Sequence, residues 1–182
     1  MISSYFSNQW HHVKRANRFI YCIKVIQYKT ATLFEALCEC TAVLAKCDDN
    51  VRTNLAMYGR NIGLAFQISD DVLDYVAESN EQIGKNIGDD LSGGKITLPF
   101  IYAFQNCSDS KKDILKDIIQ KRKIEDFLIL KDIIFETNAL EMTQNKAIEY
   151  VNLAKENVKV IENTEVANLL TFLADFSIKR KR

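Results

Sequence analysis

The segment that decides the fold is VRTNLAMYGRNIGLAFQISDDVLDYVA, residues 51–77. Its apolar residues recur every three or four positions, which predicts one long helix with a buried face. Gly59 and Gly63 are four residues apart and so lie on the same side of that helix. We expect them to let a neighbouring helix approach closely rather than to end this one. The side chains expected to turn inward are Leu55, Tyr58, Ile62, Ala65, Phe66 and Leu73.

The helical pattern extends outward from this segment over most of the chain. All six glycines and the single proline lie within residues 59–99, so the remainder lacks strong helix breakers. Residues 21–47 keep apolar or small side chains at a spacing of three to four, which predicts a second long helix. Further helices are predicted near residues 111–120, 124–136, 139–157 and 165–177.

The connection after the central helix has a different composition. Residues 78–94 are rich in Asn, Asp, Ser and Gly, which predicts a loop. A helix should begin after it near Thr97, whose hydroxyl could cap the helix, with Pro99 in the first turn. The chain as a whole is therefore predicted to be an all-α helical bundle.

Composition excludes several classes of function. The 182 residues are 47% hydrophobic and 26% charged, as in ordinary soluble globular proteins. Twenty-four basic residues balance twenty-four acidic ones, which argues against binding nucleic acid through bulk charge. The apolar runs are too short for a transmembrane segment, and the first residues lack the pattern of a secretory signal. We therefore expect a cytoplasmic protein, and the five cysteines, which lack a zinc-site spacing, to be reduced.

The most informative polar segment is QISDDVLD, residues 67–74. On a helix, Asp70 and Asp74 lie one turn apart, and Gln67 precedes Asp71 by four residues, so their polar groups share one stripe. Carboxylate oxygens suit Mg²⁺, which prefers one or two carboxylates together with waters and substrate phosphates. The alternative is a solvated acidic face without an ion, and the stripe alone leaves both interpretations open.

Three lysines near this stripe add to the pattern. Lys85 and Lys95 each follow a glycine in GKNIGDDL (84–91) and GKITLP (94–99), and Lys29 lies in a predicted helix. A lysine on a helix face is usually a surface residue with an apolar stem. Beside carboxylates that bind Mg²⁺, however, three ammonium groups would supply the positive charge that a diphosphate needs.

These motifs together resemble the C-terminal half of trans-polyprenyl diphosphate synthases, most closely bacterial enzymes of the octaprenyl type. The segments that carry the resemblance are Lys29-Thr30-Ala31 and residues 67–74 and 84–99. The resemblance implies a partial isoprenoid synthase fold that lacks its N-terminal helices. It also implies that residues 21–182 form the C-terminal part of the synthase domain and that residues 1–20 are a divergent leader.

The resemblance assigns a metal site to the acidic stripe. Asp70 and Asp71 would bind Mg²⁺ that bridges an allylic prenyl diphosphate, and Asp74 would complete the second aspartate-rich motif. The implied reaction ionises the allylic diphosphate, and isopentenyl diphosphate then attacks the cation, which lengthens the chain by one isoprene unit. Such chains serve as quinone side chains and other isoprenoids.

The resemblance also assigns roles to the remaining polar residues. Lys29 and Lys85 would contact the diphosphate leaving group and, with Asp70, would act in catalysis. Thr30 and Gln67 would assist in binding the substrate, and Lys95 would close over the same region.

One expected element of the family is missing from this sequence. Residues 1–28 contain no Asp or Glu, so nothing there supplies the first aspartate-rich motif. We therefore expect activity only when a complementary N-terminal half is present, and association into homo- or hetero-oligomers is left open. Two alternatives are a non-catalytic helical partner of a complete synthase and the product of a decayed gene fragment.

Overall fold

The computed structural model describes residues 15–76, 89–122 and 124–179. Every regular element in these ranges is a helix or helical turn, which confirms the predicted all-α class. Residues 1–14 of the predicted leader, and Lys85 among the predicted site residues, lie outside the described residues. None of the helices in the described ranges is both long and apolar enough to cross a lipid bilayer.

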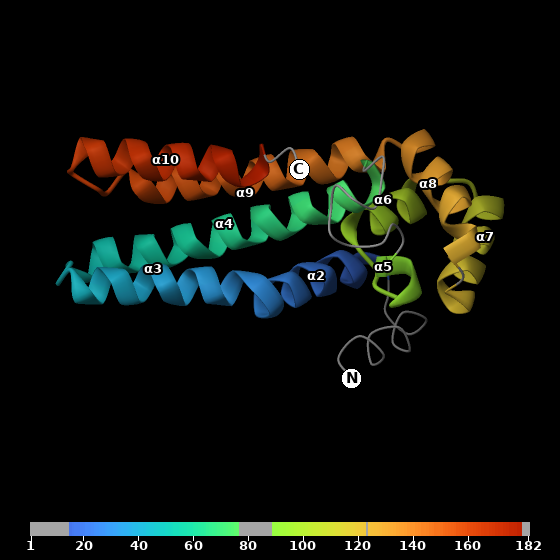
Figure 1. Ribbon diagram of the computed structural model, residues 1–182, viewed down its shortest axis with the longest axis horizontal. Coiled ribbons are helices and arrows are strands. Elements are labelled where there is room, and N and C mark those ends of the chain that lie inside the picture. Colours follow the sequence, from blue (N-terminus) through green and yellow to red (C-terminus); the bar gives the residue numbers. More distant parts are fainter. Residues whose placement is uncertain (1–14, 77–88, 123, 180–182) are drawn as a thin grey trace. The chain divides into compact units, whose positions relative to one another are not determined.

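The described residues form two compact units. The long-helix unit comprises Ile23–Ser69 and Gln144–Lys181. The short-helix unit comprises Asp70–Thr143 with the described part of residues 1–22. Helix α4 (Asp49–Val76), drawn in green in Figure 1, passes from the first unit into the second.

The long helix predicted over residues 21–47 is present but contains an irregular turn. Helix α2 (Arg15–Ile26) continues into a π-helical turn, η1 (Gln27–Ala31), and then into helix α3 (Thr32–Leu44). A π turn adds one residue to the helical path without ending the helix. Apolar spacing alone could not show this, because the flanking helices keep the same continuous pattern.

Helix α4 packs closely against η1 and α3 in the long-helix unit. A Cβ atom at Gly63 would lie 2.6 Å from the Cα atom of Ala31, and one at Gly59 would meet the carbonyl of Phe34. Ala31 is fully buried at this contact. The prediction that the two glycines admit a neighbouring helix is therefore confirmed.

The core of the long-helix unit lies between α4, α9 (Ala139–Val158) and α10 (Thr164–Ile178), which run side by side in Figure 1. The Tyr58 hydroxyl donates to the Leu170 carbonyl oxygen at 2.7 Å, so the polar end of this buried ring is satisfied. The buried members of this core are Tyr58, Ile62, Ala65, Val151, Ala154, Val158 and Ala174.

The predicted apolar face of residues 21–47 packs only in its first half. Ile26 is 4% exposed, whereas Leu37 is 66% and Leu44 is 84% exposed. With Leu33 and Cys40, these leucines form a stripe at the spacing by which one helix usually packs on another. The second half of this face is exposed, and none of the described elements covers it.

The short-helix unit contains α5 (Asp89–Ser92), α6 (Leu98–Asn106), α7 (Asp109–Lys121), a 3-10 turn η3 (Ile124–Asp126) and α8 (Phe127–Glu136). Its core includes Leu98, Leu115 and Ile134, each with no exposed surface. The predicted loop over residues 78–94 therefore ends in a short helix, and residues 77–88 lie outside the described residues.

The expected capping role of Thr97 is wrong. Thr97 is the N-cap residue of α6 and Pro99 lies in the first turn, but the Thr97 side chain makes no capping hydrogen bond. Its hydroxyl lies 3.4 Å from the hydroxyl of Tyr75 instead. Tyr75 is buried, and a buried phenol requires a hydrogen-bond partner more strongly than a helix end that other groups can satisfy.

The contact at Gly63 yields a first prediction. We expect Gly63→Ala to lower the free energy of unfolding by about 1–3 kcal/mol, because the methyl group meets the backbone of Ala31 rather than a flexible side chain. Urea unfolding measures this change. The control is Thr53→Ala, at an exposed position of the same helix, which should change stability by no more than about 0.5 kcal/mol. Equal stability of the two variants would show that the close contact is not required.

Candidate functional site

The acidic stripe lies on the last two turns of α4. Asp71 is 1% exposed, while Asp70 and Asp74 are partly exposed. The apolar neighbours Ile68 and Val72 are buried, and they hold this part of α4 in the protein interior. A carboxylate as buried as that of Asp71 is stable in its charged form only beside a positive charge.

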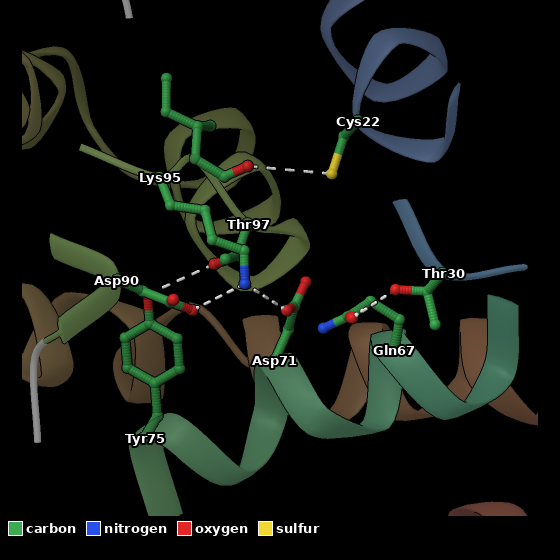
Figure 2. A network of polar contacts seen from close by, with 9 residues as sticks. Cys22, Thr30, Gln67, Asp71, Tyr75, Asp90, Lys95 and Thr97 are labelled. Atoms are coloured by element: carbon green, nitrogen blue, oxygen red, sulfur yellow. Dashed lines mark hydrogen bonds and ion pairs between the residues drawn. The ribbon is translucent and has the colours of Figure 1, made fainter. Parts of the chain in front are cut away.

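Lys95 supplies that charge (Figure 2). Its Nζ atom lies 2.9 Å from Asp71 Oδ1 and 2.9 Å from Asp90 Oδ2, so that one ammonium group bridges α4 and α5. Burial acts most strongly on Lys95 and lowers its pKa. The negative charges of Asp71 and Asp90 and their hydrogen bonds raise the pKa, and together they outweigh the effect of burial. The pKa of Lys95 therefore lies above its ordinary value. Lys95 therefore remains a cation at any physiological pH.

Two neutral groups complete the surroundings of this ion pair. Burial raises the pKa of the Tyr75 phenol, and the hydrogen bond with Thr97 offsets this only in part. Burial raises the pKa of the Cys22 thiol as well, and the charge of Asp71 adds to the effect. The Cys22 Sγ atom lies 3.9 Å from the Ile96 carbonyl oxygen, to which the thiol donates. Both groups stay protonated, which leaves the carboxylates and Lys95 to determine the local charge.

A second polar contact lies in the long-helix unit. The Thr30 hydroxyl donates to Gln67 Oε1 at 2.8 Å, and it links η1 to α4 (Figure 2). Gln67 is 9% exposed, so its amide is held in a nearly buried position. Lys29 lies in the same π turn as Thr30, and its side chain is exposed. π turns inside helices are frequent at functional sites, because they change the direction of neighbouring side chains.

The structure joins the predicted site residues in two pairs, Thr30 with Gln67 and Asp71 with Lys95. It also shows a participant that was not assigned to the site from sequence, Asp90. This residue was placed in a connecting loop, where no periodic pattern indicates a partner. The only indication in the sequence that Asp90 could pair with Lys95 is their separation of five residues. The roles of the predicted residues in binding or catalysis stay predictions.

The carboxylate oxygens of the acidic stripe are donors of the kind that Mg²⁺ prefers, although their arrangement is not that of a complete metal site. Among the described residues, no group of three or more His, Cys, Asp or Glu side chains is arranged to hold a metal ion. Mg²⁺ is commonly bound through one or two carboxylates, with waters and substrate phosphates as the other ligands. Asp71 already holds a cation in this structure, the Lys95 ammonium, and the carboxylates of Asp70 and Asp74 lie on the same helix.

Known proteins of one family are similar to this chain. Residues 8–137 match the family model described as polyprenyl synthetase. The octaprenyl diphosphate synthase of Escherichia coli is 36% identical over 163 residues, covering 88% of this chain and 50% of that protein. The short chain isoprenyl diphosphate synthase of Methanothermobacter thermautotrophicus is 34% identical over 161 residues, covering 87% and 49%.

A solved structure shows the same fold. The polyprenyl synthase from Caulobacter crescentus, complexed with calcium and isoprenyl diphosphate, superposes with a TM-score of 0.82 at 36% identity, and the match covers 88% of this chain and 49% of that one. The chain therefore belongs to the polyprenyl synthetase family, a family of prenyltransferases. It spans about half the length of the curated relatives it matches.

The ion pair yields a second prediction. We expect Lys95→Met to lower the free energy of unfolding by about 3 kcal/mol, because it removes the ammonium group from a buried carboxylate. The double variant Asp71→Asn/Lys95→Met should lose less than the sum of the single variants, as measured by urea unfolding. The control is Lys121→Met, which breaks an exposed pair with Asp117 and should change the free energy of unfolding far less. A loss for Lys95→Met no greater than that of the control would show that Asp71 does not depend on Lys95.

Proposed function

We propose that this chain is the C-terminal part of a polyprenyl diphosphate synthase and acts only together with a complementary N-terminal half. The assembled protein would condense isopentenyl diphosphate with an allylic prenyl diphosphate, in isoprenoid and quinone side-chain biosynthesis in the cytoplasm. The observation that carries this proposal is the nearly fully buried Asp71 carboxylate. It lies in a stripe of three carboxylates and binds the Lys95 ammonium group at 2.9 Å.

The reaction makes specific demands on charge. When bound, Mg²⁺ would supply the positive charge that stabilises a departing diphosphate. Asp70, Asp71 and Asp74 would hold that ion through their carboxylate oxygens. In this proposal the ammonium groups of Lys29, Lys85 and Lys95 bind the diphosphate oxygens directly.

The contact between Thr30 and Gln67 supports a role in positioning. Because Gln67 Oε1 accepts from Thr30 at 2.8 Å, the amide NH₂ group of Gln67 is oriented and its donors have a fixed direction. The same bond ties η1 to α4, so that Lys29 is carried on a turn with a defined place against α4. We infer that Thr30 and Gln67 position the lysine and an amide donor for the diphosphate.

The exposed stripe of α3 supports the need for a second half. Leu33, Leu37 and Leu44 are 74%, 66% and 84% exposed, although the other side of the same helix packs closely against α4. Contiguous exposed leucines usually mark an interaction surface. The chain spans about half the length of its relatives, and we propose that the complementary half covers this stripe. Such a cover would also keep water away from a reactive cation.

A third prediction tests autonomy. We expect the 182-residue chain, supplied with Mg²⁺, a farnesyl-type primer and isopentenyl diphosphate, to show little or no turnover, because the first aspartate-rich motif is missing. Activity should appear when an N-terminal half of a relative that carries this motif is co-expressed with it. Incorporation of labelled isopentenyl diphosphate measures both. Turnover of the chain alone at the rate of complete relatives would overturn the requirement for a second half.

A fourth prediction separates the site from other surface charge. In the reconstituted enzyme, Lys29→Ala should lower the turnover rate about 100-fold, because it removes a charge that stabilises the leaving group. Lys24→Ala, at an exposed lysine of α2, is the matched control and should change the rate less than about twofold. Equal effects of the two substitutions would contradict the assignment of Lys29.

A further inference from the structure

The turn that carries Lys95 is closed by the backbone at the end of α5. The Gly94 N–H group donates to the Leu91 carbonyl oxygen at 2.9 Å. The Lys95 N–H group donates to the Asp90 carbonyl oxygen at 2.8 Å. With Gly94 at a φ of 64°, these two bonds form the Schellman motif that ends many helices. The residues at the positions of Asp90 and Lys95 in this motif often make an apolar contact, but here their side chains form an ion pair at 2.9 Å. The turn and the ion pair therefore restrain the same two residues.

Arg122, at the end of α7, covers this turn. A Cβ atom at Gly94 would lie 2.6 Å from Nε and 2.7 Å from Cζ of Arg122, so the guanidinium group occupies the space that a side chain there would need. Gly94 is buried at this contact. Helix α5 also packs against η3, the 3-10 turn that comes after Arg122 in the chain. The segment that follows α7 thus holds both α5 and the turn that leads to Lys95.

The backbone of Arg122 adopts a conformation that arginine rarely takes. Its φ is 53°, in the left-handed region, where the Cβ atom crowds the following carbonyl group. Its N–H group donates to the Ile118 carbonyl oxygen at 2.9 Å and so ends α7, and glycine is the usual residue at such a helix end. Strained residues cluster where the position of a side chain matters. Here the guanidinium group of the strained residue meets Gly94, immediately before Lys95.

We propose that Arg122 is a positioning residue for Lys95. By covering Gly94, the guanidinium group keeps the turn in its observed conformation. In that conformation the Lys95 ammonium group bonds to both Asp71 and Asp90, each at 2.9 Å. Without the cover the turn would open more often, because glycine restricts the backbone less than any other residue. The placement of the ammonium group stands on these contacts alone, whereas its use in binding a diphosphate rests on the proposed function.

Proton exchange of the Lys95 ammonium group in the full chain tests this role. An ammonium group held by two carboxylates exchanges its protons with water more slowly than an exposed one, and nuclear magnetic resonance of the isotope-labelled chain measures the rate. The signal that Lys95→Arg removes is that of Lys95. Arg122→Gly should accelerate its exchange at least about fivefold, because the turn opens more often. Arg122→Lys keeps the charge but not the planar group, so its rate should lie between those of the wild type and Arg122→Gly.

The matched control is Lys46→Gly. Lys46 is also a basic residue with a left-handed backbone, at a φ of 55°, but its side chain is exposed. Both substitutions by glycine relieve the same kind of backbone strain, and they differ in the loss of the contact at Gly94. Lys46→Gly should therefore leave the exchange of the Lys95 ammonium group unchanged.

Three results would overturn the proposal. The first is an exchange rate that Arg122→Gly leaves unchanged, or that Arg122→Lys leaves unchanged if circular dichroism shows the glycine variant to be unfolded. The second is an equal acceleration by Lys46→Gly. The third is a wild-type Lys95 signal that exchanges as fast as those of exposed lysines. If the exchange responds as expected while the reconstituted enzyme shows no turnover, the proposed function fails and the placement of Lys95 by Arg122 stands.

Discussion

The close contact between Gly63 and Ala31 is the constraint on which the polar part of the long-helix unit depends. It fixes the separation between α4 and the π turn, and only at that separation does the Thr30 hydroxyl reach Gln67 at 2.8 Å. A side chain at position 63 would move the turn that carries Lys29 and Thr30 away from α4. A requirement on backbone packing thus determines the geometry of hydrogen bonding, although Gly63 itself carries no functional group.

The short-helix unit depends on a different balance, between burial and charge. The Asp71 carboxylate is nearly inaccessible to water, so its charged form is stable only while a cation lies beside it. Lys95 is that cation, and because it also pairs with Asp90 it links α5 to α4. A divalent ion that binds Asp71 must therefore share the carboxylate with Lys95 or displace it. If the ammonium group is displaced by the ion, it becomes available to an anion that arrives with the metal.

The sequence was sufficient to predict the helices, the glycine contact and the acidic stripe, because each follows from spacing along one helix. The ion pairs of Lys95 with Asp71 and with Asp90 depend on how α4 and α5 pack, and the spacing of residues along the sequence does not contain that information. The contact of the Thr97 hydroxyl with Tyr75, in place of a capping bond to α6, also depends on how helices pack and could not be read from the sequence. The spacing of Leu37 and Leu44 predicts an apolar stripe but does not show whether a partner covers it, since the pattern is the same in both cases.

The π turn also has a consequence for how this segment tolerates changes in length. A π turn contains about one residue more than an α turn, so removing one residue from Gln27–Ala31 would restore a regular helix without breaking it. Because the π turn takes up its extra residue within a single turn, the residues on the two sides of the deletion would keep nearly the same rotation relative to each other. A chain shortened in this way would remain helical with α2 and α3 aligned, and the change would be confined to the direction of the side chains on the turn that carries Lys29 and Thr30.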